Sequence, residues 1–309
     1  MTVSPLLPAL RALTSFSPSP SLPACDLDEL APVLVAHGLA PIASWHCEQT
    51  RLGAGLPDRF REALLGHYSG TVNDNVLRLV TLRNALKDVA EVPVVLLDGA
   101  AYVDWLYPHM AWRPVSDLRL AVRGADGRRF ADGVGRGLKL LRTGDEGRTA
   151  VFSDGAVELA LQEGLWPGAV EDEALFTRAT PARAFGPRAS RPAPEEALLC
   201  AVADLAQAAL WAPLIRYLDL RELLRLPHDP ALVKARAERA GLSRALHGAT
   251  LLAAFFFPEV AEAAAAVRPE LGPVERAAVE QVADAARDPA RLRHLRGTEA
   301  AARLVVAPS

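Results

Sequence analysis

The chain has 309 residues, which is enough for about two domains of ordinary size. Half of the residues are hydrophobic and 23% are charged, so we expect a packed core and exclude wholesale disorder. The formal net charge of -3 argues against a protein that coats nucleic acid through a strongly basic surface.

Cysteine usage and the apolar segments indicate the compartment. The three cysteines, Cys25, Cys47 and Cys200, are far apart and odd in number, which favours a reducing, cytoplasmic compartment over a disulfide scaffold or a cysteine zinc site. Residues 1–23 contain several prolines and no basic n-region, so we expect a flexible arm rather than a signal peptide. The apolar stretch at 249–257 is well short of the ~18 residues that a membrane span needs.

Helices are expected in the first part of the chain after this arm. Residues 26–38 begin with Asp26 and Glu29 at the spacing of a capping box and end at Gly38, which is typical of a helix. Residues 58–69 and 73–90 carry apolar residues at helical spacing. In the second of these helices one buried stripe is predicted, formed by Val76, Leu79, Val80, Leu82 and Leu86.

The pattern changes to short strands and helices from residue 92 onwards. Residues 92–97 are a β-branched run that ends at Asp98-Gly99, as expected for a strand buried on both faces. Residues 116–122 alternate and predict a second strand. Two further runs flank Asp154-Gly155 and predict a hairpin, over 148–153 and 156–161. Helices are expected at 100–107 and 125–141.

The predicted fold is α/β (α+β), with a small mixed sheet, an N-terminal helical region and a C-terminal helical domain. A proline- and arginine-rich loop at 181–194 is interpreted as the linker between the sheet and the last domain. The expected divisions are an arm (1–23), N-terminal helices (24–90), a core with the sheet (91–180), the linker (181–194) and a helical domain (195–309). Within that domain we expect helices over 195–211, 213–226, 229–240, 242–257, 259–267, 273–286 and 288–304.

One stretch, 96–122, carries a recognisable chemistry. A strand ends in a small-residue turn at Gly99-Ala100, where backbone N–H groups can approach a phosphate. Two carboxylates spaced i, i+2 on the next strand would face the same side and could hold Mg²⁺. A third carboxylate on a neighbouring strand would complete a two-metal site. This layout resembles the core of the polymerase-beta-type nucleotidyltransferases.

Within that superfamily the chain resembles the large uncharacterised family of bacterial nucleotidyltransferase-like proteins. The specific part is Leu106-Tyr107-Pro108 followed by Arg113-Pro114-x-Ser116-Asp117, and Val157-Glu158-Leu159-Ala160 stands where the family has Val-Asp-Leu-His. Asp219 matches a later position of the pattern. The resemblance implies Mg²⁺ as cofactor and an NTP as substrate, with catalytic and metal-binding roles for Asp117 and Glu158 and a metal-binding role for Asp98. It also implies nucleotide-binding roles for Gly99, Ala100, Arg113 and Ser116.

Several polar positions depart from the family pattern. Arg119 replaces the second carboxylate of the strand pair, Asp98 replaces a lysine, and Ala160 replaces a histidine. At 4 Å and an effective dielectric constant of ~20, two unit charges of like sign repel by about 4 kcal/mol, and a divalent ion roughly doubles this value. Arg119 therefore opposes metal binding, and we expect it to pair with Asp117, Glu158 or Asp98 in a salt-bridge network instead.

Three functions stay open at this point. The first is a degenerate member, a pseudoenzyme that binds a small ligand, a protein partner or a second copy of itself. The second is an active Mg²⁺-dependent nucleotidyltransferase that moves a nucleoside monophosphate from an NTP to a hydroxyl acceptor. The third is an unrelated helical scaffold or interaction protein. Trp105, Tyr107 and Trp112 flank the glycine turn; they could stack on a base, although such positions are more often core.

Overall fold

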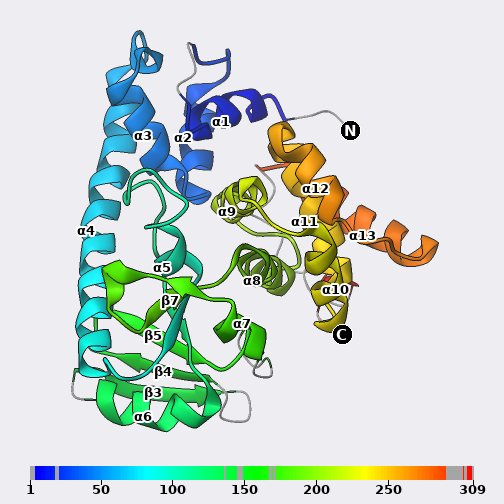
Figure 1. The fold of residues 1–309 in the computed structure, drawn as a ribbon. Helices are drawn as coiled ribbons and strands as arrows, with labels where there is room; N and C mark the ends of the chain where they lie inside the picture. Colours follow the sequence, from blue (N-terminus) through cyan, green and yellow to red (C-terminus); the bar gives the residue numbers. More distant parts are fainter. Residues whose placement is uncertain are drawn as a thin grey trace. The chain divides into compact units, whose positions relative to one another are not determined.

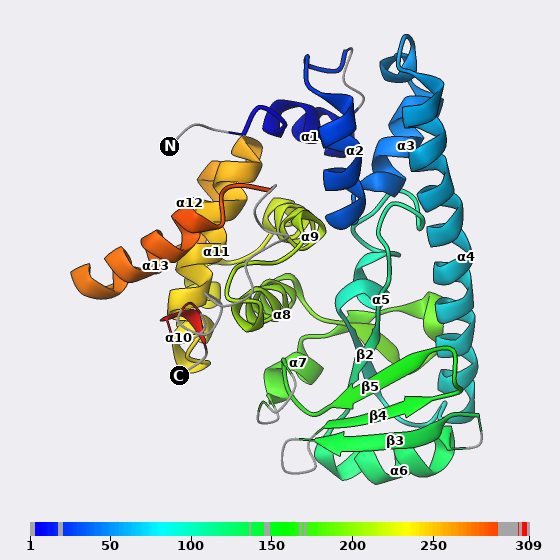
Figure 2. The same ribbon diagram turned by 180° about the vertical axis from the view of Figure 1, so that it is seen from behind.

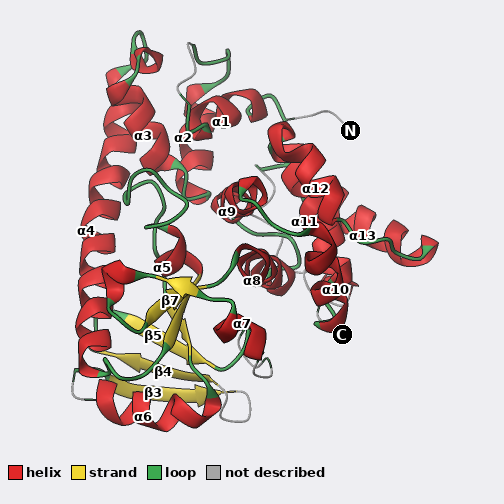
Figure 3. Cartoon of the chain, in the orientation of Figure 1, coloured by secondary structure: helices red, strands yellow, loops and turns green. Residues whose placement is uncertain are grey.

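The computed structural model describes most of the chain, in two compact units. The described residues are 4–17, 21–135, 137–144, 149–166, 169, 172–289, 302 and 305–307, with residues 51 and 142–144 described by their backbone only. Unit 1 consists of Met1–Thr71, Ala111–Arg113 and Ala201–Ser309, and unit 2 consists of Val72–Met110 and Pro114–Cys200. Figure 1 follows the chain through both units, and Figure 3 shows that it is a mixed α/β protein, as predicted.

Unit 2 is built on one mixed sheet, whose strand order in the described part is β3-β4-β5-β2-β1-β7-β6. The strands are β1 (Val94–Leu97), β2 (Leu118–Ala121), β3 (Lys139–Gly144), β4 (Thr149–Ser153), β5 (Glu158–Gln162), β6 (Thr180–Pro181) and β7 (Ala189–Arg191). Strand β2 lies between β1, with which it is antiparallel, and β5, with which it is parallel. The pair Leu97↔Arg119 ends the β1–β2 ladder, so the residue after Leu97 lies beside Arg119.

The sequence prediction for this sheet is confirmed at its centre and wrong at one edge. Strands β1 and β2 and the antiparallel pair β4–β5 are present where expected, with Gly155 in the turn at a φ of 96°. The expected helix at 125–141 ends earlier, as α6 (Gly124–Val134), and β3 follows it. Figure 2 shows β5, β4 and β3 following one another across this side of the sheet. Leu140 and Leu141 are exposed on β3, which is an edge strand in the described part of the sheet.

The predicted linker at 181–194 is also wrong, because it contains strand structure. The register pairs Val94↔Ala189 and Val95↔Ser190 add β7 to β1 in parallel, and β6 pairs with β7. These residues therefore belong to the sheet and do not separate two domains. The other short helices of unit 2 are α5 (Asp98–Tyr102), α7 (Glu173–Thr177) and η3 (Arg183–Phe185).

Helix α4 (Asp58–Asp88) replaces the two helices expected at 58–69 and 73–90, and its second half belongs to unit 2. Its buried stripe contains Asn75, Leu79, Leu82 and Leu86, at helical spacing, while Val76 and Val80 are exposed. Asn75 is buried because its side-chain amide donates to the Met110 carbonyl (2.7 Å) and accepts from the Val115 amide (2.9 Å). The prediction placed Val76 on the buried face because it assumed that only apolar residues are buried there. The buried residue is instead its polar neighbour, Asn75.

Unit 1 is helical in its described part. Its elements are α1 (Leu7–Thr14), α2 (Leu27–Ala36), α3 (Ala40–Gln49), η1 (Arg51–Gly53), α9 (Leu214–Arg225), α10 (Pro230–Arg239), α11 (Ser243–Phe256), η4 (Pro258–Val260), α12 (Ala261–Val267) and α13 (Pro273–Ala285). Helix α8 (Pro194–Gln207) begins in unit 2 and ends in unit 1. Asp26 caps α2 through the amides of Asp28 and Glu29, and Gly38 follows with a φ of 69°, as expected.

The helical segments differ from the sequence prediction at the N-terminus and in how they group. The flexible arm is wrong for Leu7–Thr14, because Leu7, Leu10 and Leu13 bury one face of α1. The N-terminal helices (24–90) and the C-terminal helical domain (195–309) were expected to be separate, whereas the larger part of each lies in unit 1. The helix expected at 288–304 lies largely outside the described residues. No helix within the described ranges has the length and apolar character needed to cross a bilayer.

The cysteine thiols give a first testable prediction. Cys47 and Cys200 are buried, Cys25 is partly exposed, and none of the three is in a disulfide. Burial raises the pKa of the Cys47 thiol to about 11, with a smaller contribution from Glu48. Burial also raises the pKa of the Cys25 thiol, but this thiol is partly exposed. Since the thiolate is the reactive form and the reagent must reach it, we expect iodoacetamide at about pH 8 to modify Cys25 first in the folded protein. Peptide mass spectrometry after a short reaction checks this order, and equal labelling of Cys25 and Cys47 would contradict it.

The buried His46 predicts a dependence of stability on pH. Its side chain has no exposed surface, and its Nε2–H donates to the carbonyl of Ser15 at 2.6 Å. Burial lowers the pKa of His46, although the bond to Ser15 partly opposes this shift. Below its usual pKa of about 6.5 the unfolded chain therefore takes up a proton that the folded chain does not. The free energy of unfolding should fall as the pH drops through this value towards the lowered pKa.

A glutamine at position 46 is the matched test, because its amide can donate to Ser15 without titrating. Urea unfolding of the wild type and of His46→Gln, at about pH 8 and about pH 5, should show a larger loss for the wild type. Equal losses in the two proteins would show that His46 does not titrate as described.

Candidate functional site

The candidate site lies where β1, α5 and β2 meet in unit 2. Strand β1 ends at Leu97, and Asp98 begins α5 with a φ of 50°, in the left-handed region. Non-glycine residues rarely adopt this conformation, and aspartate is among those that tolerate it. Asp98 is 2% exposed, so its carboxylate is held inside unit 2 at the end of the strand.

Arg119 of β2 supplies the positive charge at this point. Its Nη2 donates to Oδ2 of Asp98 at 2.6 Å, and its Nε lies 3.1 Å from Oδ2 of Asp117. The arginine side chain is 11% exposed and that of Asp117 is 41% exposed. Asp117 and Arg119 are two residues apart and face the same side of the strand. One guanidinium thus joins a buried and a half-buried carboxylate, which confirms the expected pairing of Arg119 with Asp98 and Asp117.

Ser116 completes this cluster. Its hydroxyl donates to Oδ1 of Asp117 at 2.6 Å, so both carboxylate oxygens of Asp117 interact with neighbours in the chain. We call Asp98, Ser116, Asp117 and Arg119 the Arg119 cluster. The role expected for Ser116, contact with a nucleotide, stays a prediction.

Glu158 lies next to this cluster in register but on the exposed end of its strand. Strand β5 runs parallel to β2 with Leu118 opposite Leu159 and Arg119 opposite Ala160. Continuing this register by one residue places Glu158 opposite Asp117. Glu158 is exposed to solvent. Across the described residues there is no group of three His, Cys, Asp or Glu side chains placed to hold a metal ion. The three carboxylates expected as ligands do not form such a group.

The small-residue turn is covered by the protein. Gly99 and Ala100 lie in the first turn of α5, and both are buried. The Gly99 carbonyl accepts the amide of Val103 within the same helix. The roles of Gly99 and Ala100 in nucleotide binding stay predictions that require this turn to become accessible.

Arg113 does not fit the nucleotide-binding role expected for it. It belongs to unit 1, where its Nη2 and Nε donate to Oδ2 and Oδ1 of Asp219 on α9, at 2.8 and 3.3 Å. Each of the two side chains is 2% exposed. A buried guanidinium bound to one carboxylate by two parallel bonds is poorly placed to contact a phosphate. The role expected for Arg113 stays a prediction that this geometry does not support.

The aromatic residues near the turn are core residues for the most part. Trp112 is buried, with ring-centroid distances of 4.8 Å to Trp45 and 5.2 Å to Phe16 in unit 1. Tyr107 is buried, and Trp105 lies 4.8 Å from the guanidinium of Arg191. Core packing, the more common role for such positions, is observed for Trp112 and Tyr107, whereas Trp105 is partly exposed.

Sequence reasoning missed one acidic pair of unit 2. Arg178 pairs with Glu195 at 2.6 Å and with Glu196 at 3.1 Å, and both glutamates are buried in the first turn of α8. Burial by itself lowers the pKa of Arg178, but the two carboxylates together outweigh it and raise this pKa above its ordinary value. Two acidic residues at a helix start are common for electrostatic reasons alone, so the sequence held no signal for this pairing.

The strand, turn, short helix and second strand with Asp117 form a nucleotidyltransferase-like core. Comparison with known families agrees, because the family described as "Uncharacterised nucleotidyltransferase" matches residues 23–258. This match spans well over half of the chain, and the protein belongs to that family. No curated protein and no solved structure matches the chain.

Proposed function

We propose that this protein is a pseudoenzyme of its nucleotidyltransferase family, which uses the fold to bind a small ligand or a protein partner. It does not transfer nucleotides by two-metal chemistry. The observation that carries this proposal is the position of Arg119, whose guanidinium lies between the carboxylates of Asp98 and Asp117. The proposal includes a reducing, cytoplasmic location, which fits three cysteines that are not in disulfides.

Electrostatics explains why Arg119 and a magnesium ion exclude each other. A divalent ion about 4 Å from the guanidinium would be repelled by about 8 kcal/mol at an effective dielectric constant of ~20. Binding of Mg²⁺ would therefore require Arg119 to leave Asp98, which is 2% exposed. The buried carboxylate would then lose its cation, and the ion would have to replace that interaction as well.

An active nucleotidyltransferase is the second candidate, and it rests on Asp117 and Glu158. Both residues retain exposed surface, and they stand in adjacent register on the parallel strands β2 and β5. In this candidate they bind Mg²⁺ in an altered arrangement, while the NTP donates its nucleoside monophosphate to a hydroxyl acceptor. This candidate requires the guanidinium of Arg119 to bind the phosphates of the NTP and to lie far enough from Mg²⁺ not to repel it.

Calorimetric titration of ATP, GTP, CTP and UTP, each with and without Mg²⁺, separates the two candidates. The variant Asp117→Ala removes the carboxylate at the cluster, and Asp126→Ala is its control, because Asp126 pairs with Arg129 elsewhere in unit 2. We expect no Mg²⁺-dependent binding and no release of pyrophosphate. Mg²⁺-dependent binding that Asp117→Ala abolishes and Asp126→Ala retains, together with pyrophosphate release, would establish the enzyme instead.

A further inference from the structure

A second candidate site lies in unit 1, where α1 and the turn after it face α9. The pocket between them has a volume of about 590 Å³, and its walls include Arg11, Ala12, Phe16, Arg221, Arg225 and Glu259. All of its lining residues belong to unit 1. Those from α1 and the following turn precede residue 23, where the family match begins. The family relationship therefore does not account for this pocket.

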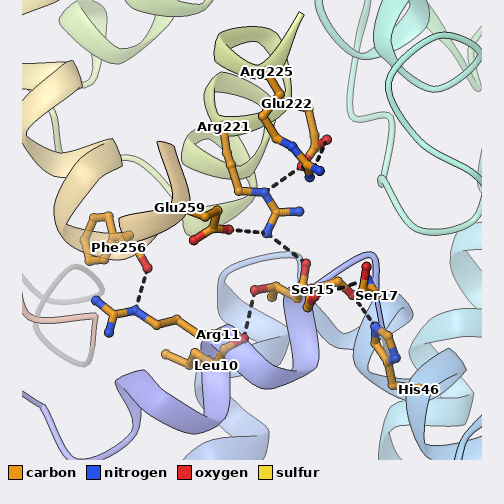
Figure 4. Close-up of polar contacts among 11 residues, drawn as sticks. Leu10, Arg11, Ser15, Ser17, His46, Arg221, Glu222, Arg225, Phe256 and Glu259 are labelled. Carbon is orange, nitrogen blue, oxygen red and sulfur yellow. Dashed lines mark hydrogen bonds and ion pairs between the residues drawn. The ribbon is translucent and has the colours of Figure 1, made fainter. Parts of the chain in front are cut away.

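Arg221 is the central polar residue of the pocket. It is 2% exposed, and its Nε donates to Glu222 at 2.6 Å while its Nη1 donates to the Thr14 carbonyl at 3.1 Å. The ring centroids of Phe16 and Phe257 lie 4.8 and 5.0 Å from the guanidinium carbon of Arg221. For the third nitrogen, Nη2, no hydrogen-bond partner exists among the described residues. Figure 4 shows the Arg221 nitrogen that makes no dashed contact pointing away from Glu259.

A buried N–H group without a partner points to a missing acceptor, because buried polar groups in folded proteins are nearly always hydrogen-bonded. The charges around Arg221 define the kind of acceptor. Arg11, Arg221 and Arg225 carry three positive charges, against two negative charges on Glu222 and Glu259. The excess of one positive charge favours an anion.

The remaining walls add room and an apolar surface. Arg225 is half exposed, and its Nη1 lies 3.4 Å from Oε1 of Glu222. The ring of Phe16 and the side chain of Ala12 face the same pocket. A volume of this size accommodates an organic molecule rather than a lone ion.

We propose that this pocket binds a small organic anion, whose oxyanion group contacts Arg221 and Arg225 and whose apolar part packs on Phe16. Arginine forks match both phosphate and carboxylate oxygens, so the oxyanion group is the shared feature of the ligand. This site goes beyond the function proposed above, since none of its residues belongs to the Arg119 cluster.

Calorimetric titration of the full chain with phenyl phosphate, benzoate and inorganic phosphate tests the proposal. We expect saturable binding of at least one of the two aromatic anions, with weaker binding of inorganic phosphate, which lacks the apolar part. The stronger of the two aromatic probes identifies the oxyanion as phosphate or carboxylate. Ala12→Trp fills the pocket from the partly exposed face of α1 and should abolish binding.

The arginine variants provide the matched comparison. Arg225→Gln should weaken binding by up to about fivefold, as expected for the loss of a half-exposed ionic contact. Arg129→Gln is its control, because Arg129 is similarly exposed, makes the same i, i+3 pair with an acidic residue and lies in unit 2. The proposal is overturned if neither aromatic anion binds saturably. It is equally overturned if binding is unchanged in both Ala12→Trp and Arg225→Gln.

Discussion

Replacement of Arg113 by methionine is expected to lower the free energy of unfolding by about 3–5 kcal/mol. The reason is that Asp219, which is 2% exposed, would keep its negative charge inside unit 1 without the guanidinium that binds both of its oxygens. Methionine retains much of the apolar volume of the arginine side chain, so the loss reports on the charge. Urea unfolding followed by circular dichroism measures it.

Arg59→Met provides the comparison for this prediction. Arg59 pairs with Asp28 at 3.1 Å, but both side chains are largely exposed, so the same substitution should cost about 1 kcal/mol or less. The double variant Arg113→Met/Asp219→Leu should recover much of the stability, because it leaves no buried charge. A loss for Arg113→Met no larger than that for Arg59→Met would show that the buried pair does not stabilise unit 1.

Replacement of Arg119 by alanine is expected to lower the free energy of unfolding by about 2–4 kcal/mol. The substitution removes the cation from Asp98, which is buried, and from Asp117, which is partly solvated. The estimate is smaller than for Arg113 because the arginine side chain is 11% exposed and water screens part of the interaction. Denaturant titration gives the value.

Arg123→Ala is the control for Arg119. Arg123 follows strand β2 and pairs with Glu173 at 2.7 Å, but the carboxylate is 61% exposed. We expect a change of at most about 1 kcal/mol. If Arg119→Ala behaves like Arg123→Ala, then Asp98 does not depend on Arg119 for its burial, and the proposed conflict between Arg119 and a metal ion loses its energetic basis.

The centre of the sheet and the pairing of Arg119 could be predicted from local sequence. Strand β1 is a continuous run of valine and leucine, which is typical of a strand buried on both faces. The exchange of charge at positions 98 and 119 predicted that an arginine would replace a metal ion as the partner of the carboxylates. Both signals depend on residues close in sequence or on one pattern of polar positions.

The parts that could not be predicted depend on contacts between distant residues. Strand β7 has three residues and is defined by its parallel pairing with β1, about a hundred residues earlier. Arg113 and Asp219 each match the family pattern, but nothing in either segment indicates that they pair with each other across 106 positions. The pocket at Arg221 is likewise lined by residues of both α1 and α9. It could not be predicted from a sequence in which the α1 segment was expected to be a flexible arm.

The most direct test of the central claim is a calorimetric titration of Mg²⁺ into the wild type and into Arg119→Asp. The variant removes the guanidinium and places a third carboxylate near Asp98 and Asp117, so a metal ion gains the charge that it needs. We expect Mg²⁺ to bind the variant measurably and the wild type not at all. Binding to the wild type as tight as to the variant would show that Arg119 does not take the place of the metal, and the pseudoenzyme proposal would be wrong.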